Sequence, residues 1–407
     1  MSFRYPAGVV GATVTPSGPY QTSTAPGIWS LAGQANFKAQ SLWPTQGSVQ
    51  GYNLYGWGTN TFGQLGLGNT TDYSSPKQVG ALTSWLKMSA GYYHCAAIKN
   101  DGTLWTWGRG GSGQLGLGNA TNYSSPKQVG SLTTWSQIYC GANFCAAITT
   151  TGQLWTWGAN NQGQLGLGNT TYFSSPKQVG ALTSWLNIAC NAYGMIATQS
   201  SGGGVSLWAW GYGAQGQLGL GNTTTYSSPK QVGSLTNWTS IGSALQCTLA
   251  IKNDGTLWSW GDNSQGQLGL GNTTSFSSPK QVGALTTWSK LPNTQGGDTR
   301  GTGAITTTGE LYVWGSGIFG DLGLGNTTNY SSPKQLGLLT SWSNISTGRF
   351  YAAATQSNGK LFSWGFNSNG RLGLGNITDY SSPKQIGALT SWLNIASGQV
   401  FAIALKN

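Results

Sequence analysis

Short segments of alternating apolar and polar residues recur along the chain after residue 50. In one copy, the apolar segment Cys95–Ile98 precedes Asn100-Asp101-Gly102, and the alternating segment Leu104–Trp107 follows. Glycine supplies the positive φ of a tight hairpin turn, and alternation with period two is typical of half-buried strands. The pattern therefore predicts a β-hairpin in every copy and an all-β chain.

Two further β-compatible segments flank each predicted hairpin. The segment S-P-K-Q-V contains Pro76 or one of its six counterparts, which we place at a strand start, where the ladder loses no donor. The segment W-x-x-I, which begins at Trp135 in one copy, supplies the other strand. Four strands per copy make one propeller blade. The glycines of G-Q-L-G-L-G, from Gly63 in the first copy, suit a tight, positive-φ path from one blade edge to the next.

The tryptophan of a W-G pair marks the period of the repeat. Its spacings are 50, 50, 53, 50, 54 and 50 residues, a range that indicates propellers or solenoids, and the seven residues are Trp57, Trp107, Trp157, Trp210, Trp260, Trp314 and Trp364. The chain ends in the first arm of a hairpin, whereas the first copy begins at Gly51 with the second arm. We therefore expect the C-terminal strand to pair with the first strand after residue 50. This pairing closes a seven-bladed β-propeller of four-stranded blades over residues 51–407, preceded by an irregular N-terminal arm, residues 1–50.

Composition narrows the classes of function. Charged residues make up 7% of the chain, far below the usual share of about 25%, and the net charge of +11 comes from 19 basic and 8 acidic residues. This balance reflects few acids rather than a dense basic patch, so it does not favour nucleic acid as a partner. The sequence contains no apolar run of 18 residues and no secretory signal, so we expect no membrane insertion and folding in a cytosol.

Residues that carry catalytic chemistry are scarce. The chain has one histidine, His94, and the few acids form no pair with an acid/base division of labour. The cysteines are odd in number and lack C-x-x-C spacing, which argues against a disulfide framework or a zinc site; they are Cys95, Cys140, Cys145, Cys190 and Cys247. The sequence therefore predicts no enzyme, no catalytic or metal-binding residues and no cofactor.

Two sets of repeated positions are candidates for surface binding. The first is the lysine of each S-S-P-K-Q segment, which sevenfold symmetry places in one ring: Lys77, Lys127, Lys177, Lys230, Lys280, Lys334 and Lys384. This ring could meet an acidic partner, or the lysines could simply discourage strand addition at blade edges. The second set lies in the variable four residues after each W-G pair: Arg109, Tyr212, Asp262, Phe319 and Phe366.

The motif G-T-L-W-T-W-G-x-N-x-x-G-Q-L-G-L-G-N, followed by S-P-K-Q-V and then A-G-Y-Y-H-C-A-A-I, resembles the regulator of chromosome condensation repeat family over residues 51–407. The resemblance implies a seven-bladed propeller. The family includes the nucleotide-exchange factor for the small GTPase Ran, a plant UV-B photoreceptor and many interaction modules. This chain has only short insertions near Ser201–Gly204 and Asn293–Arg300, no acidic face, and no arginine beside Trp85 or its equivalents, so neither specialised activity is expected.

Within the arm, the segment Ala25–Pro44 resembles structural and tail proteins of tailed bacteriophages. Its candidate anchor residues are Ile28, Trp29, Leu31, Phe37 and Trp43. The first hypothesis is therefore a non-enzymatic virion protein, a capsid decoration or tail component, anchored to other virion proteins by residues 1–50. Its propeller would contact a host surface glycan or protein.

The sequence leaves two alternatives open. One is a cellular scaffold of the chromosome-condensation repeat type that binds protein or chromatin, with a cytoplasmic location. The other is a carbohydrate-binding lectin, whose exposed aromatic rings would stack on sugars. Most of the 20 tryptophans recur at framework positions and are expected in the core. The host, the ligand, the oligomeric state and the displayed face stay open.

Overall fold

The computed structural model describes residues 4–5, 8–9, 50–292 and 301–407 and divides the chain into two units, Met1–Gln50 and Gly51–Asn407. In the first unit, β1 (Arg4–Tyr5) pairs antiparallel with β2 (Gly8–Val9). The predicted anchor residues Ile28, Trp29, Leu31, Phe37 and Trp43 lie outside the described residues, so their role stays a prediction.

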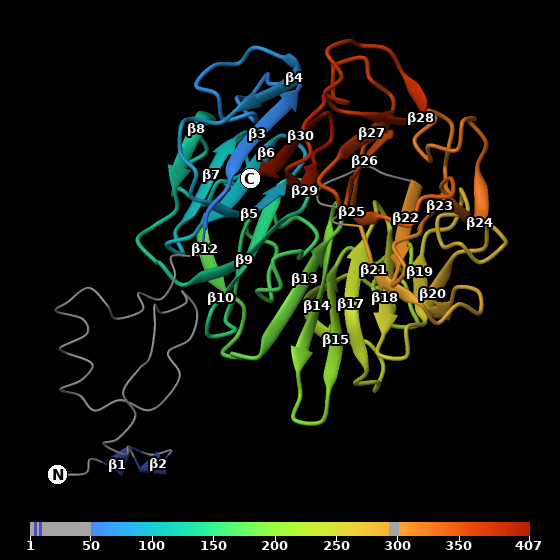
Figure 1. Cartoon of the computed structure of the whole chain (residues 1–407). Helices are drawn as coiled ribbons and strands as arrows, with labels where there is room; N and C mark the ends of the chain where they lie inside the picture. The colour runs from blue at the N-terminus through green and yellow to red at the C-terminus, as the bar shows by residue number, and fades with distance from the viewer. Residues whose placement is uncertain (1–3, 6–7, 10–49, 293–300) are drawn as a thin grey trace. The chain divides into compact units, whose positions relative to one another are not determined.

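The second unit consists of seven antiparallel sheets of four strands each, as predicted (Figure 1). Blade 1 is β29 (Trp392–Ser397), β30 (Phe401–Lys406), β3 (Asn53–Gly58) and β4 (Tyr73–Gln78); blade 2 is β5 (Trp85–Ala90), β6 (His94–Lys99), β7 (Leu104–Gly108) and β8 (Tyr123–Gln128); blade 3 is β9 (Trp135–Cys140), β10 (Phe144–Thr149), β11 (Leu154–Gly158) and β12 (Phe173–Gln178). Blade 4 is β13 (Trp185–Cys190), β14 (Gly194–Ser200), β15 (Val205–Gly211) and β16 (Tyr226–Gln231); blade 5 is β17 (Trp238–Ser243), β18 (Cys247–Lys252), β19 (Leu257–Gly261) and β20 (Phe276–Gln281). Blade 6 is β21 (Trp288–Lys290), β22 (Gly301–Thr306), β23 (Leu311–Gly315) and β24 (Tyr330–Gln335); blade 7 is β25 (Trp342–Gly348), β26 (Tyr351–Gln356), β27 (Leu361–Gly365) and β28 (Tyr380–Gln385).

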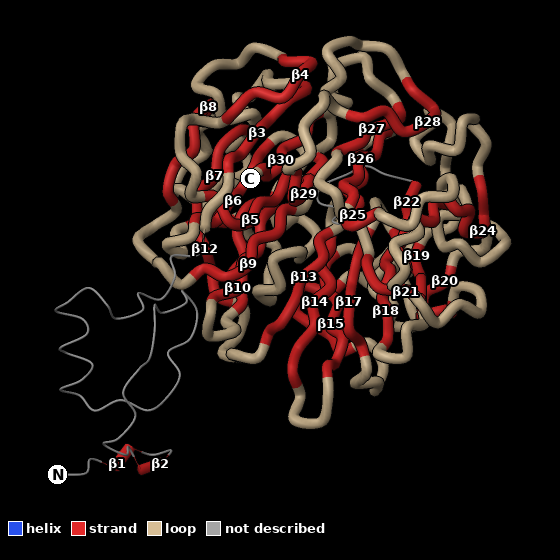
Figure 2. The backbone as a smooth tube through the Cα atoms, viewed as in Figure 1, coloured by secondary structure: helices blue, strands red, loops and turns tan. Residues whose placement is uncertain are grey.

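Burial explains the composition of the strands. From β25 through β29, β5, β9 and β13 to β17, the first strands of neighbouring blades contact each other, which makes them the innermost strands of the ring. The second strands are packed on both faces, so the side chains on both faces of the strand are buried and mostly apolar. In β6 every residue is buried. The fourth strands form the outer edge, and β4 has no fully buried residue. Strands and loops account for the described structure (Figure 2), and no described segment forms a helix able to span a membrane.

Two details of the predicted blade are wrong. Pro76 is the fourth residue of β4 rather than its first, because the strand begins at Tyr73; an edge strand tolerates the missing donor. The G-Q-L-G-L-G segment joins the third and fourth strands of one blade rather than two blade edges. Its glycines do have positive φ, and a Cβ atom on Gly66 would lie 2.9 Å from Nε1 of Trp107 in the next blade.

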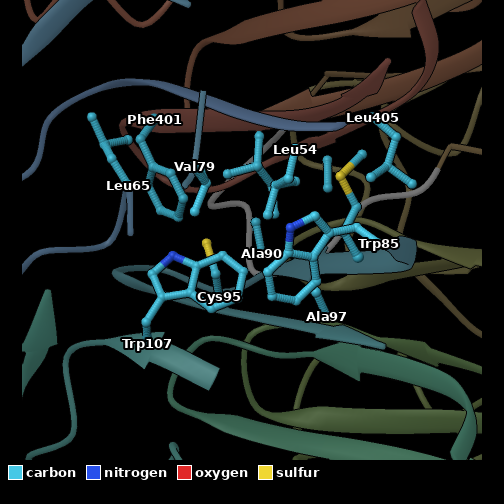
Figure 3. Packing of buried hydrophobic residues seen from close by; sticks show 13 residues of the cluster. Leu54, Leu65, Val79, Trp85, Ala90, Cys95, Ala97, Trp107, Phe401 and Leu405 are labelled. Carbon is cyan, nitrogen blue, oxygen red and sulfur yellow. The ribbon is translucent and has the colours of Figure 1, made fainter. Parts of the chain in front are cut away.

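Both ends of residues 51–407 meet in blade 1, as predicted. The strands β3 and β30 pair antiparallel from Asn53↔Lys406 to Gly58↔Phe401. Figure 3 shows Leu54, Phe401 and Leu405 of this composite blade packed beside Trp85 and Trp107 of blade 2, within one buried cluster. The ring is therefore closed by a hairpin whose arms come from opposite ends of the propeller.

A second contact repeats at every boundary between blades. The indole N–H of each W-G tryptophan donates to a main-chain carbonyl in the loop of the preceding blade, at 2.9 to 3.0 Å. The bond from Trp57 to the Arg371 carbonyl joins blade 1 to blade 7 and completes the set. Since all seven tryptophans are fully buried, each bond is made away from water.

Removal of residues 401–407 tests the closure. The deletion leaves β3 without a partner on one side and exposes the apolar surface around Leu54 and Leu65. Because several large core side chains are lost together, we expect the melting temperature to fall by more than about 10 °C, as measured by calorimetry. A synthetic peptide of residues 401–407 should restore part of the loss. An unchanged melting temperature would contradict the closure by β30.

Candidate functional site

One end of the propeller carries most of the sequence variation between blades. There, the loop after the third strand lies beside the turn between the first two strands. The amide of Arg109 donates to the Tyr93 carbonyl at 2.8 Å, and the amide of Phe366 donates to the Phe350 carbonyl at 2.8 Å. We call this end the loop face.

Only part of each variable four-residue loop is available for recognition. Its second residue is a buried Asn or Gly in all seven blades. In blade 1 the side-chain Nδ2 of Asn60 donates to the Asn69 carbonyl, and the side-chain Oδ1 accepts from the Leu65 amide at 2.9 Å. This position therefore holds the loop in shape, whereas the third position is exposed in every blade and the fourth is exposed in blades 4 and 7.

The five residues predicted in these loops are half-buried and fall into separate groups. Phe319 and Phe366 come together from neighbouring blades, with ring centroids 5.3 Å apart. Arg109 lies over the Phe62 ring, and Tyr212 packs edge-on against Tyr193. Asp262 is engaged within its own loop, where it accepts hydrogen bonds from Ser264 and Gln267.

Phe319 and Phe366 belong to a larger patch on blades 6 and 7, which we call the aromatic–arginine patch: Ile318, Phe319, Arg349, Phe350, Phe366 and Arg371. The Phe319 and Phe350 ring centroids are 4.3 Å apart. The Arg349 and Arg371 guanidinium groups lie 5.1 and 4.9 Å from the rings of Phe350 and Phe366. The patch therefore combines tilted, packed rings with a half-buried arginine, Arg349, and a buried one, Arg371; aromatic residues and arginine are typical of protein-binding hot spots.

Two features of the patch depart from the rest of the chain. Phe350 has a φ of 64°, the one positive value for a residue other than glycine in the described ranges. A phenylalanine in this region of conformational space is strained, and such strain is typical of functional sites. Arg371 replaces the glutamine of the G-Q-L motif; it is 3% exposed and donates to the Arg349 carbonyl and to Asn369.

Sequence reasoning missed Ile318, Arg349, Phe350 and Arg371. Ile318 lies in one of the variable four-residue loops, and Arg371 departs visibly from the glutamine of the repeat. Arg349 and Phe350 occupy the turn before the second strand, which reads Tyr-Tyr, Ala-Asn or Arg-Phe in different blades. Variation in that turn was the available signal, because the fold brings both variable segments to one face.

Asp321 occupies the same glutamine position in blade 6. Burial raises the pKa of its carboxyl to about 6, although the amides of Asp321 and Phe319 lower it in part. Five blades carry a buried glutamine at this position: Gln64, Gln114, Gln164, Gln217 and Gln267. Blades 6 and 7 have thus replaced a neutral side chain with an acid and a base beneath the patch.

The predicted lysine ring lies on the outermost strands. All seven side chains are exposed, and each ammonium group lies 5.3 to 5.6 Å from the centroid of the aromatic ring that begins its own strand. None forms an ion pair with another residue in the described ranges. The seven lysines therefore lie on the outer strands, as expected, and a binding role for these lysines stays a prediction.

Most tryptophans are framework residues, as expected, and fourteen are buried. Four half-buried ones remain in the propeller: Trp105, Trp155, Trp208 and Trp258. Three of these line grooves between blades with volumes of about 290 to 400 Å³. In two grooves a lysine covers the ring, with Lys99 at 3.6 Å from the Trp105 centroid and Lys252 at 3.7 Å from Trp258. The lectin alternative stays a prediction that would place sugars in these grooves.

A cluster of potential metal ligands lies between blades 2 and 3. Spacing along the chain argues against a metal site, yet the fold brings together His94, Cys140 and Cys145 with their ligand atoms within 4.8 Å of one another. Burial raises the pKa of Cys140, but hydrogen bonds with Cys145 and His94 lower it to about 5 overall. Burial and the neighbouring Cys140 raise the pKa of Cys145. The prediction of no metal site was made from spacing along the chain, and it stays a prediction.

Comparison with known proteins agrees with the fold. The family model described as regulator of chromosome condensation (RCC1) repeat matches seven segments: residues 53–98, 101–148, 151–197, 206–251, 254–290, 308–355 and 358–405. The chain belongs to this family.

Solved structures similar to this chain include Prp20p from Saccharomyces cerevisiae, with a TM-score of 0.77 and 20% identity over 88% of this chain and 92% of that one. Yeast RCC1 (Prp20) bound to Kap60 gives 0.77 and 20% over 88% and 90%. Human WBSCR16 gives 0.76 and 23% over 88% and 99%. At these identities the likeness shows the fold alone.

Replacement of Asp321 tests the altered glutamine position. The pKa of Asp321 is about 6 in the folded state, above its ordinary value of 3.8, so the folded state binds the proton more tightly than the unfolded state does. This preference stabilises the folded protein fully below about pH 4, and the stabilisation is lost as pH rises through 6. The shift corresponds to about 3 kcal/mol. We expect Asp321→Gln to increase the free energy of urea unfolding relative to the parent protein more at about pH 7.5 than at about pH 4.5. A difference that is constant over this range would contradict the raised pKa.

Proposed function

We propose that this chain is a non-enzymatic protein-binding scaffold whose loop face recognises an acidic segment of a partner that also carries an apolar side chain. The observation that carries the proposal is the aromatic–arginine patch on blades 6 and 7. It lies on a repeat framework in which the other blades keep glutamine, small or polar residues at most of the same positions.

The chemistry of the patch supports this class of partner. Arginine guanidinium groups bind carboxylates in a fixed fork geometry, and aromatic rings contribute large contact areas at small entropic cost. Ile318 is 53% exposed beside Phe319, so an apolar partner side chain would find a contact there, while the half-buried Arg349, rather than the buried Arg371, would meet a carboxylate. Two described acids lie near these loops: Asp321 is 9% exposed and presents little charge at the surface, whereas Asp379 is exposed and accepts a hydrogen bond from the Asn367 amide at 2.6 Å.

Family membership supports a binding role in general terms. Among the similar structures, Prp20p is described with binding to Gsp1p and histones, and yeast RCC1 is bound to Kap60. Those partners belong to those proteins. For this chain, they favour the scaffold hypothesis over the virion hypothesis, which rests on arm residues outside the described ranges and stays a prediction.

Peptide binding tests the proposal. Fluorescent peptides of equal length would carry Asp and Glu with Leu and Phe, or the same apolar residues with Lys, or the same acids with Ser. We expect only the first to bind, and its affinity to fall as salt rises. The double variant Arg349→Ala/Phe350→Asn introduces the residues of blade 3, Ala142 and Asn143, into blade 7. It should weaken binding about tenfold or more.

The matched control is Tyr193→Asn, which makes the same kind of change at the same repeat position in blade 4. It should leave the affinity within about twofold of the parent protein, because Tyr193 lies outside the patch. Equal binding of the acidic peptide by the double variant and the parent protein would contradict the proposal. So would a failure of the parent protein to prefer the acidic apolar peptide.

A further inference from the structure

Three soft or borderline metal ligands converge at the boundary between blades 2 and 3. His94 begins β6 in blade 2, whereas Cys140 ends β9 and Cys145 belongs to β10 in blade 3. The Nε2 atom of His94 lies 3.2 Å from Sγ of Cys145, and the two Sγ atoms are 3.0 Å apart. All three side chains are fully buried.

The backbone is arranged to bring these side chains together. Cys140 and Cys145 are directly opposite each other in the sheet. The Cys140 amide donates to Ser89 Oγ at 2.7 Å rather than to Cys145. The two cysteines therefore form a non-hydrogen-bonded pair of the antiparallel ladder, the kind of pair in which side chains lie closest together. Ser89 belongs to β5, and its bond therefore also ties Cys140 to blade 2.

His94 occupies a position at which other blades place an aromatic ring over a glycine. A Cβ atom on Gly91 would lie 2.1 Å from the His94 ring, just as one on Gly141 would meet Phe144 and one on Gly348 would meet Tyr351. From this position the Tyr351 hydroxyl donates to carbonyls of Gly398 and Phe401 in the following blade. His94 reaches the following blade in the same way, but its contact there is a sulfur.

The Nδ1 atom of the imidazole is buried without a hydrogen-bond partner in the described part of the chain. A buried polar ring costs free energy unless its polar atoms are satisfied. Equivalent positions in other blades carry Phe144 or Phe401 for His94, Ala90 or Cys190 for Cys140, and Cys95 or Ala402 for Cys145. The repeat therefore folds without any of the three donors, and their convergence at one boundary calls for a separate explanation.

We propose that His94, Cys140 and Cys145 bind one Zn²⁺ ion that links blade 2 to blade 3. Two thiolates and a neutral imidazole form a ligand set that zinc uses in proteins, and the two thiolates balance its charge, while a water molecule would complete the tetrahedral coordination. The sulfur atoms would separate slightly from their present distance to surround the ion. A disulfide between Cys140 and Cys145 is the rival, but it would use two of the three donors and leave His94 without a role.

Metal uptake by the full-length protein tests this site. The protein is reduced with a phosphine, stripped with a chelator, incubated with Zn²⁺ and passed through a desalting column before elemental analysis. We expect one Zn²⁺ per chain and a higher melting temperature than for the stripped protein. Replacement of Zn²⁺ by Co²⁺ should produce a sulfur-to-cobalt charge-transfer band, which reports thiolate ligands.

The variants His94→Phe, Cys140→Ala and Cys145→Ala each introduce a residue found at the same position in another blade, so folding should be kept. Each should abolish zinc retention and the zinc-dependent rise in melting temperature. Cys190→Ala, at the position of Cys140 in the next blade, is the matched control and should retain one Zn²⁺. Failure of the reduced parent protein to bind Zn²⁺ would overturn the proposal, as would equal loss of zinc in Cys190→Ala. An untreated protein two daltons lighter, together with no zinc uptake after reduction, would assign the pair to a disulfide instead.

Discussion

The indole N–H of each W-G tryptophan bonds to a main-chain carbonyl of the preceding blade, and the rest of the propeller depends on this contact. A buried N–H and a buried C=O each cost free energy when left unpaired, so the seven tryptophans and the loops that receive them have to be in register. The glycine two residues after the acceptor provides the space, since a Cβ atom on Gly66 would meet the indole of Trp107. Because the acceptor is a backbone atom, the side chain of the accepting residue is free to change. Glutamine, Asp321 and Arg371 all support the same bond.

This freedom explains how a uniform ring carries a differentiated surface. Blades 6 and 7 keep the indole–carbonyl bonds while an acid and a base replace glutamine beneath the loop face. Phe319, Phe350 and Phe366 then pack against one another at tilted angles from two neighbouring blades. The same separation of framework and variation applies to His94, which takes a ring position otherwise filled by Phe144 or Tyr351. Its neighbours in the following blade are cysteines, where blade 1 has alanine and serine.

The ring itself could be predicted from the sequence because repetition, hairpin turns and the complementary ends are all local signals. The exact start of β4 could not, since proline is compatible with several positions in an edge strand. Of the candidate site, Phe319 and Phe366 could be identified from variation in one loop. Their assembly with Arg349 and Phe350 required knowing that a second turn reaches the same face. The cluster of His94 with Cys140 and Cys145 was hidden for a related reason: the donors belong to two blades, and their spacing follows the repeat rather than any metal-binding motif.

Hydrogen exchange of the tryptophan indole groups tests the closed ring most directly. In the ¹⁵N-labelled protein, the Nε1–H of Trp57 bonds to Arg371 across the junction of blades 1 and 7, and the other six bonds join blades that are consecutive in the chain. We expect the exchange rate of the Trp57 indole to lie within about tenfold of the other six, because opening any one boundary exposes equivalent buried surface. Rapid exchange at Trp57, with the other six protected, would show that the ring is open at this junction.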